Sequence, residues 1–182
     1  MKKTLLIFLL LTVNIAYGVD STKLAVNKNT FGDWELIEFA LPKGLIYRIS
    51  TTSLISKKEF LTFDFLPNGK CQPDPAVMVQ EFKGYVKGLD GGTLLYEYKI
   101  PNQESSVEFV KVVMQNGDKF AFFVFQKLIA QKLLDSPIDG RLAIWIPASG
   151  DGTVKRSENI YFSLKGLSAA YSQARKLCLA NQ

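Results

Sequence analysis

The chain has 182 residues, of which 47% are apolar and 21% charged, a composition that supports a folded core and excludes a disordered protein. It contains two cysteines and no histidine, which excludes Ser-His and Cys-His catalytic pairs, histidine-ligated metal sites and a four-thiolate zinc site. The formal net charge of +5 is a mild excess without a dense run of Lys or Arg, so nucleic acid is not an expected partner.

The beginning of the chain has the three regions of a secretory signal peptide. A basic Met-Lys-Lys start is followed by an apolar run over 4–13 and by small residues at Ala16 and Gly18. An uncleaved membrane anchor is the competing interpretation, but the apolar run is shorter than the about 20 residues that a spanning helix needs. We therefore predict a signal peptide over 1–18 and a single β-rich domain over 19–182, periplasmic or secreted, without an integral membrane segment.

The two cysteines are far apart in the sequence. Cys71 lies in a proline-rich loop over 67–75, and Cys178 lies near the C-terminus. In an oxidising compartment we expect them to form a disulfide, which would close a loop of about a hundred residues and contribute about 4–5 kcal/mol in the chain-entropy model. Two free thiols, one of them buried, are the alternative. A catalytic thiol is disfavoured because no histidine can activate it.

Short β-rich runs separated by turn residues follow a polar lead over 20–30. The predicted strands cover 33–39, 45–54, 60–66, 76–86, 93–100, 107–114, 119–125, 141–146 and 159–164. Asn116-Gly117 is a strong hairpin signal between two of them. The run over 119–125 is apolar on both faces, which places it centrally in a sheet. The segment over 128–134 fits either a strand or a short helix.

The last part of the chain has helical spacing instead. Its apolar residues recur at i, i+3 and i+4 while polar residues face away. The apolar positions are Leu167, Ala170, Tyr171, Ala174, Leu177 and Cys178. A run of strands followed by one amphipathic helix predicts a mainly β fold, an antiparallel β-sandwich or open barrel with the C-terminal helix packed against it.

The search for catalytic motifs finds few options. A phosphate-binding glycine loop, a Ser-x-x-Lys pair and a Gly-x-Ser-x-Gly elbow are all missing from the sequence, and we expect no cofactor. Histidine-free hydrolysis by a pair of carboxylates remains chemically possible, although no spacing indicates such a pair. The candidate carboxylates are Asp33, Glu35, Glu38, Asp64 and Glu81.

Two predicted strands carry a candidate binding surface. Glu81, Lys83, Tyr85 and Lys87 alternate along one strand and are expected to point outward together. The strand over 93–100 has Leu94, Tyr96, Tyr98 and Ile100 on one face and Thr93, Leu95, Glu97 and Lys99 on the other. We expect this strand to be a neighbour of the first one, with Lys99 and Glu97 beside its outward-pointing residues. An aromatic ring among lysines can contact carbohydrate, an anionic polymer or a partner protein. An ordinary solvated sheet face is the alternative.

Two segments near the ends of the predicted domain resemble a known family. Phe31-Gly32-Asp33-Trp34 opens the first predicted strand, and residues 162–170 (FSLKGLSAA) lead from the last strand into the helix. This pattern resembles the invasion-associated locus B family of small exported bacterial proteins. The chain departs from that family in its cysteines, because Glu38 stands where the family usually has a Cys shortly after the Trp. Independently of the resemblance, we expect Trp34 to anchor the core and Gly166 to form a strand-to-helix turn.

The resemblance implies an exported β-sandwich-like protein without an established catalytic site and associated with host-cell interaction. We therefore expect a non-enzymatic protein that binds a host or envelope protein and is associated with virulence, and we leave its oligomeric state open. The alternative is a periplasmic inhibitor or immunity protein that inserts the loop over 67–75 into an envelope-targeting enzyme. The positive net charge disfavours a lysozyme as its target, because lysozymes are commonly basic.

Overall fold

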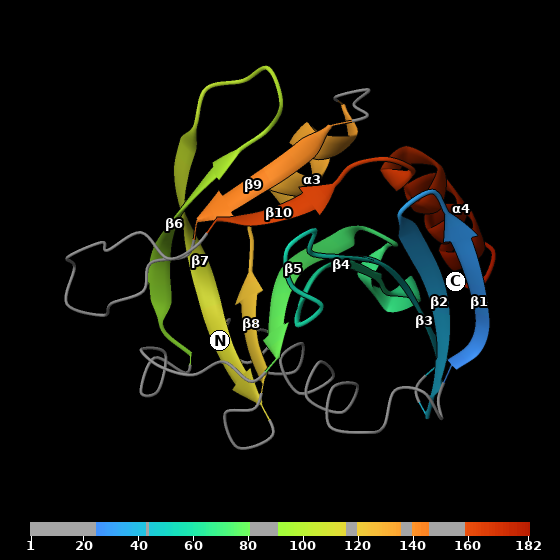
Figure 1. The fold of residues 1–182 in the computed structure, drawn as a ribbon. Coiled ribbons are helices and arrows are strands. Elements are labelled where there is room, and N and C mark those ends of the chain that lie inside the picture. Colours follow the sequence, from blue (N-terminus) through green and yellow to red (C-terminus); the bar gives the residue numbers. More distant parts are fainter. Residues whose placement is uncertain (1–24, 43, 81–90, 116–119, 136–139, 146–158) are drawn as a thin grey trace.

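Ten antiparallel strands form one curved, unclosed sheet in the computed structural model, which describes residues 25–42, 44–80, 91–115, 120–135, 140–145 and 159–182 (Figure 1). In chain order the strands are β1 (Ala25–Phe31), β2 (Trp34–Leu41), β3 (Gly44–Thr52), β4 (Glu59–Phe65), β5 (Pro73–Gln80), β6 (Thr93–Lys99), β7 (Ser106–Gln115), β8 (Phe120–Val124), β9 (Arg141–Trp145) and β10 (Ile160–Ser163). Their order in the sheet is β1-β2-β3-β4-β5-β8-β7-β6-β9-β10, and the predicted fold class is confirmed.

The core lies on one face of this curved sheet. Along β4, for example, Leu61, Phe63 and Phe65 are buried on the core face, and Asp64 lies on the other face. Trp34 in β2 is fully buried and its ring contacts that of Phe63, with 5.6 Å between centroids, so its expected role as a core anchor is confirmed. Period-two alternation of apolar residues is what turns one face of each strand inward.

Two helices cover the core side of the sheet. The segment that fitted strand or helix is a helix, α3 (Lys127–Leu134), and it buries Ile129, Ala130 and Leu133. The C-terminal helix α4 (Leu167–Leu179) packs mainly on β3, as its apolar spacing predicted (Figure 1). Two of its buried residues are Ala170 and Ala174, whose small side chains let the helix approach the strands closely.

The structure corrects two boundaries. Part of the predicted polar lead is strand β1, which is exposed along nearly its whole length and is ordered by pairing with β2 rather than by burial. The predicted proline-rich loop contains a 3₁₀ turn over Pro67–Gly69, and β5 begins within it at Pro73. Prolines are tolerated there because β8 pairs with β5 only from Ala76 onward, so the preceding residues need no ladder N–H on that side.

The segments that carry the family resemblance contact each other, and we call Phe31–Trp34 together with Ser163–Gly166 the terminal joint. The indole Nε1 of Trp34 donates to the Ser163 carbonyl oxygen at 3.0 Å, and the Ser163 hydroxyl donates to the Asp33 carboxylate at 2.6 Å. The backbone N–H of Asp33 also donates to the Lys165 carbonyl at 3.1 Å. These bonds join the two ends of the described chain, more than a hundred residues apart.

Glycine is required at the joint because two backbones touch there. Gly166 has φ +92° and forms the turn into α4, as the sequence predicted. A Cβ atom at Gly166 would overlap the carbonyl oxygen of Phe31, and one at Gly32 would lie 2.8 Å from the Lys165 oxygen. Both positions therefore depend on the missing side chain as well as on a positive φ.

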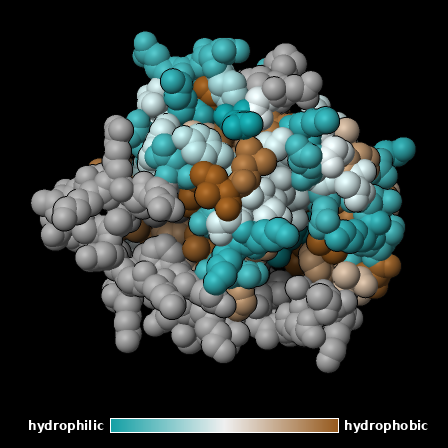
Figure 2. All heavy atoms as spheres, viewed as in Figure 1, coloured by the Kyte–Doolittle hydropathy of each residue, from teal (hydrophilic) through white to brown (hydrophobic). Residues whose placement is uncertain are grey.

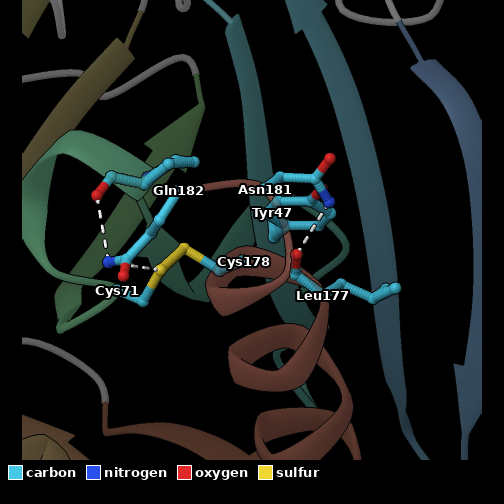
Figure 3. The surroundings of a disulfide bond; sticks show 7 residues. Tyr47, Cys71, Leu177, Cys178, Asn181 and Gln182 are labelled. Carbon is cyan, nitrogen blue, oxygen red and sulfur yellow. Dashed lines mark hydrogen bonds between the residues drawn. A yellow bond between two sulfur atoms is a disulfide. The ribbon is translucent and has the colours of Figure 1, made fainter.

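A disulfide between Cys71 and Cys178 adds a second connection between the chain's distant parts, and that prediction is confirmed (Figure 3). It ties the segment after the 3₁₀ turn to the last turn of α4. Next to it, the Asn181 amide donates to the Tyr47 hydroxyl at 2.7 Å, and the Gln182 amide donates to the Pro67 carbonyl at 3.2 Å. Burial, with the negative charge of Glu38 as a smaller cause, raises the pKa of Tyr47.

Candidate functional site

The structure places one residue of the predicted binding surface. Lys99 is the last residue of β6 and is exposed on the face away from the core. Glu81, Lys83, Tyr85 and Lys87 lie outside the described residues, so their arrangement stays a prediction. The expected adjacency of the two strands is wrong for their described parts, because β8 and β7 lie between β5 and β6. β8 pairs with β5 on one side and with β7 on the other. The chain therefore crosses past two strand positions on its way from β5 to β6.

The predicted alternation along β6 is confirmed. Tyr96 and Tyr98 are buried, whereas Leu95 and Lys99 are exposed. In the pairing with β7, Leu95 stands opposite Phe109 and Glu97 stands opposite Val107. Directly opposed residues of an antiparallel pair lie on the same face of the sheet, so these side chains form one surface.

We call this surface the β6–β7 outer face, defined by Leu95, Glu97, Lys99, Val107, Phe109 and Lys111. Its three apolar members are unusually open to solvent: Leu95 is 48% exposed, Val107 62% and Phe109 59%. Single exposed apolar residues are ordinary, but three that are neighbours by register form a contiguous patch. Such a patch is what a partner protein can cover.

Cations lie at both ends of the β6–β7 outer face. Lys111 stands opposite Thr93 at one end, and Lys99 stands opposite Ala143 of β9 at the other. Arg141, also exposed, lies two residues from Ala143 on the same face of β9. Among the described residues, these three cations form no ion pair. Their charges are therefore available to a partner.

The core-facing side of the β6–β7 hairpin carries a cluster of polar side chains. The Lys132 ammonium of α3 donates to the Tyr98 hydroxyl at 2.7 Å and lies 3.3 Å from Glu108, and the Tyr98 hydroxyl donates to Glu108 at 2.8 Å. The hydrogen bond to Tyr98 is the main reason that the pKa of Lys132 is raised, and the bond to Glu108 adds to it. The cluster fixes α3 against β6 and β7.

This cluster is incomplete. The Tyr96 hydroxyl and the Oε2 atom of Glu108 are buried without a hydrogen-bond partner. Burial, reinforced by the Glu108 charge, strongly raises the pKa of Tyr96. An unpaired buried polar atom costs stability, so this region is less well satisfied than the terminal joint.

A shallow groove of about 260 Å³ lies on the outer face of β2 to β5. Its lining includes Ile37, Phe39, Phe60 and Met78 together with polar residues. Arg48 also lines it, but its guanidinium forms a bidentate pair with Asp64, with both hydrogen bonds at 2.6 Å. The groove is thus lined by both polar and apolar side chains, and the one cation among its described lining residues is already paired with a carboxylate.

Each of the carboxylates considered for hydrolysis that the structure describes has a partner of its own. In the described part of the chain these contacts are Ser163 with Asp33, Lys28 with Glu35, Asn27 with Glu38 and Arg48 with Asp64, while Glu81 lies outside it.

The described residues also contain no group of three Cys, Asp or Glu side chains that could hold a metal ion. None of the helices in the same ranges is both long and apolar enough to cross a membrane.

Sequence reasoning placed Leu95 on the β6–β7 outer face but missed Val107 and Phe109, for a physical reason. The strand over 107–114 has apolar residues on both faces, and Glu108 alternates with Val107 and Phe109. Alternation alone would put Glu108 outside and the two apolar residues inside, which is opposite to the structure. Lys132, which compensates Glu108, comes from a distant helix that no local pattern connects to it.

Among solved structures, the chain is similar to the crystal structure of invasion associated protein B from Bartonella henselae. The TM-score is 0.58 at 12% sequence identity, and the match covers 86% of this chain and 99% of that chain. An identity this low shows a shared fold alone. No family model matches the chain, and no curated protein matches it in sequence.

Proposed function

We propose that this chain is an exported, non-enzymatic bacterial protein that acts by binding another protein in the periplasm or outside the cell. Its relation to the invasion-associated locus B family, and with it a role in host-cell interaction or virulence, is part of this proposal. The shared fold with an invasion associated protein supports it. The contact between the two segments that resemble the family also supports it, because residues of both segments take part in the same hydrogen-bonded joint.

The observation that carries the binding role is the exposed apolar patch of Leu95, Val107 and Phe109. Burial of such side chains by a partner yields about 25 cal/mol for each Å² of apolar surface removed from water. The signal-peptide pattern and the disulfide both fit an oxidising compartment outside the cytoplasm.

A non-enzymatic role is supported by the chemistry of the carboxylates. Asp64 is held in a bidentate pair with Arg48, and Asp33 accepts a hydrogen bond within the terminal joint. A hydrolytic pair needs one carboxyl that is free to give or take a proton at the substrate. These two groups are engaged in structural contacts instead.

The inhibitor alternative is disfavoured because the loop over 67–75 does not project freely from the fold. An inhibitory loop must project into the cleft of its target, but Cys71 in the middle of the loop is buried and bonded to Cys178. Gln182 donates to Pro67 at the start of the same loop. The loop is therefore held against the C-terminal end of the chain.

Expression of the full precursor in a bacterium tests export, and capture tests binding. We expect the mature protein to begin at Val19, by mass spectrometry, and to be recovered from the periplasm or medium. Immobilised mature protein should then retain a specific protein from envelope or host-cell surface extracts. Retention in the cytoplasm with an intact N-terminus contradicts the location, and an enzymatic activity that acts on envelope polymers contradicts the non-enzymatic role.

A further inference from the structure

We propose that the β6–β7 outer face is the docking site and that its partner is a protein surface with an apolar centre flanked by carboxylates. This inference rests on the proposed protein-binding function and names the place and the chemistry of the contact. It depends on three features of the described residues, which are the apolar centre, the cations at both ends, and the position of the face relative to the rest of the fold.

The apolar centre consists of two adjacent rows across the hairpin. Leu95 and Phe109 form the first row, and Val107 lies opposite Glu97 in the next. The outer face of an antiparallel sheet that only meets water normally carries polar residues at such positions. An exposed leucine–phenylalanine pair beside an exposed valine is therefore explained by a surface that covers them in the bound state.

The cations define the partner's charge. Lys111 and Lys99 lie in the two end rows of the hairpin, about 20 Å apart at roughly 3.4 Å per residue along a strand. Arg141 reinforces the end at Lys99, and Glu97 is the one acid on the face. A partner with carboxylates beside its apolar centre meets these cations favourably, and the same charges speed association at low salt.

The same charges disfavour a second copy of this chain as the occupant. A two-fold contact places the same face on both sides of the interface, so each copy brings the same surplus of cations to it. With a single glutamate available on each face, the like charges are not balanced. An acidic partner has no such cost.

The face lies apart from the terminal joint and from the disulfide. In Figure 1, β6 and β7 lie at the left side of the sheet, whereas α4 and β1 lie at the right. Figure 2 shows that hydrophobic groups also reach the surface near the centre of this view, with hydrophilic side chains around them. Substitutions on the outer face can therefore be tested without disturbing the terminal joint or the disulfide.

The test uses a display library of random 12-residue peptides selected on the immobilised mature protein at low salt, together with the extracts described above. Two variants change the face, Leu95→Ser with Phe109→Ser and Lys99→Glu with Lys111→Glu. Two matched controls make the same changes elsewhere, Val26→Ser with Leu179→Ser at other exposed apolar residues and Arg175→Glu with Lys176→Glu on α4. Circular dichroism and thermal melting are used to check that all four variants fold.

We expect selected peptides to combine Asp or Glu with Leu or Phe, and we expect both face variants to weaken binding at least tenfold while the controls change it less than twofold. Selection of basic peptides overturns the proposal, and so does binding that the face variants leave unchanged. Two further results also overturn it: a dimer in sedimentation that Leu95→Ser with Phe109→Ser dissociates, or face-dependent flotation with vesicles of phosphatidylglycerol and phosphatidylcholine.

The outcomes separate this inference from the proposed function. A protein captured equally by the wild type and by both face variants leaves protein binding in place and assigns it to another surface. Failure of both the library and the extracts to give any specific ligand overturns the binding function itself, and the docking site with it.

Discussion

The terminal joint and the β6–β7 outer face differ in how completely their groups are satisfied within the chain. In the joint, the Trp34 indole, the Asp33 carboxylate and the Ser163 hydroxyl all have partners across the two ends of the chain. On the outer face, Phe109 is more than half exposed and Lys99 forms no ion pair within the described chain. Groups with internal partners stabilise a fold, whereas exposed apolar and charged groups without them are available for binding.

The largest expected effect is on the joint itself. Gly166→Ala places a Cβ atom against the Phe31 carbonyl, and a backbone cannot move aside as a flexible side chain can. We expect this variant to lose more than about 4 kcal/mol of unfolding free energy or to fail to fold, as measured by urea denaturation.

Gly91→Ala is the matched control for that variant. Gly91 also has a positive φ, +79°, but nothing lies within 4 Å of the Cβ atom that alanine would add. We expect only the cost of the left-handed backbone, about 1–2 kcal/mol. Equal losses in the two variants would show that backbone conformation, and not the close approach at the joint, makes Gly166 necessary.

The disulfide gives the next largest effect. Replacement of both Cys71 and Cys178 by alanine frees the end of α4 from the segment before β5, and we expect a loss of about 2–5 kcal/mol. The denaturation midpoint of the double variant should match that of the reduced wild type. Two free thiols in periplasmically expressed wild-type protein, detected by mass after alkylation without reductant, would contradict the bond.

The polar cluster below the β6–β7 outer face predicts opposite results for two neighbouring tyrosines. Tyr98→Phe removes hydrogen bonds to Glu108 and Lys132, so we expect a loss of about 1–3 kcal/mol. Tyr96→Phe removes a buried hydroxyl that has no partner, so its stability should be unchanged or up to about 1–2 kcal/mol higher. Urea denaturation of both variants measures the difference, and equal losses would contradict the assigned bonding.

Alkaline pH is expected to weaken the fold. The folded state holds the protons of Tyr47, Tyr96 and Lys132 more tightly than the unfolded chain, because the pKa of each is raised. Stability from these groups is therefore complete below the unfolded pKa values near 10 and is lost as the pH rises through the folded ones. Denaturation midpoints should fall between pH 9 and pH 11, and less steeply in Tyr96→Phe. A denaturation midpoint that rises over this pH range would contradict the raised pKa values of these three groups.

The sequence predicts most of the elements because period-two alternation reports burial directly. The strand over 93–100 agrees with the structure for that reason, and the C-terminal helix agrees because its i, i+3, i+4 spacing reports burial in the same way. Strand β1 was missed because its residues are exposed and its order comes from hydrogen bonds to β2, which leave no hydrophobic pattern. The helix α3 was ambiguous because a segment this short fits both periods.

The candidate site was less predictable than the fold. Lys99 was placed on the correct face because its own strand alternates, but the neighbours of that strand are set by the pairing of β8 with β5, which puts β8 and β7 between β5 and β6. No local pattern contains that information. The orientation of Phe109 depends in turn on the half-buried Glu108, whose charge is compensated by Lys132 of α3.

The smallest expected effect on stability is at the β6–β7 outer face, and it sharpens the contrast with the joint. Phe109→Ser removes a side chain that contributes cross-strand contact with Leu95 but little burial, so we expect a loss of less than about 1 kcal/mol. Phe63→Ala in the core is the comparison, with an expected loss of about 3–5 kcal/mol. Similar losses at the two positions would mean that Phe109 is needed by the fold, and its exposure would then no longer argue for a partner.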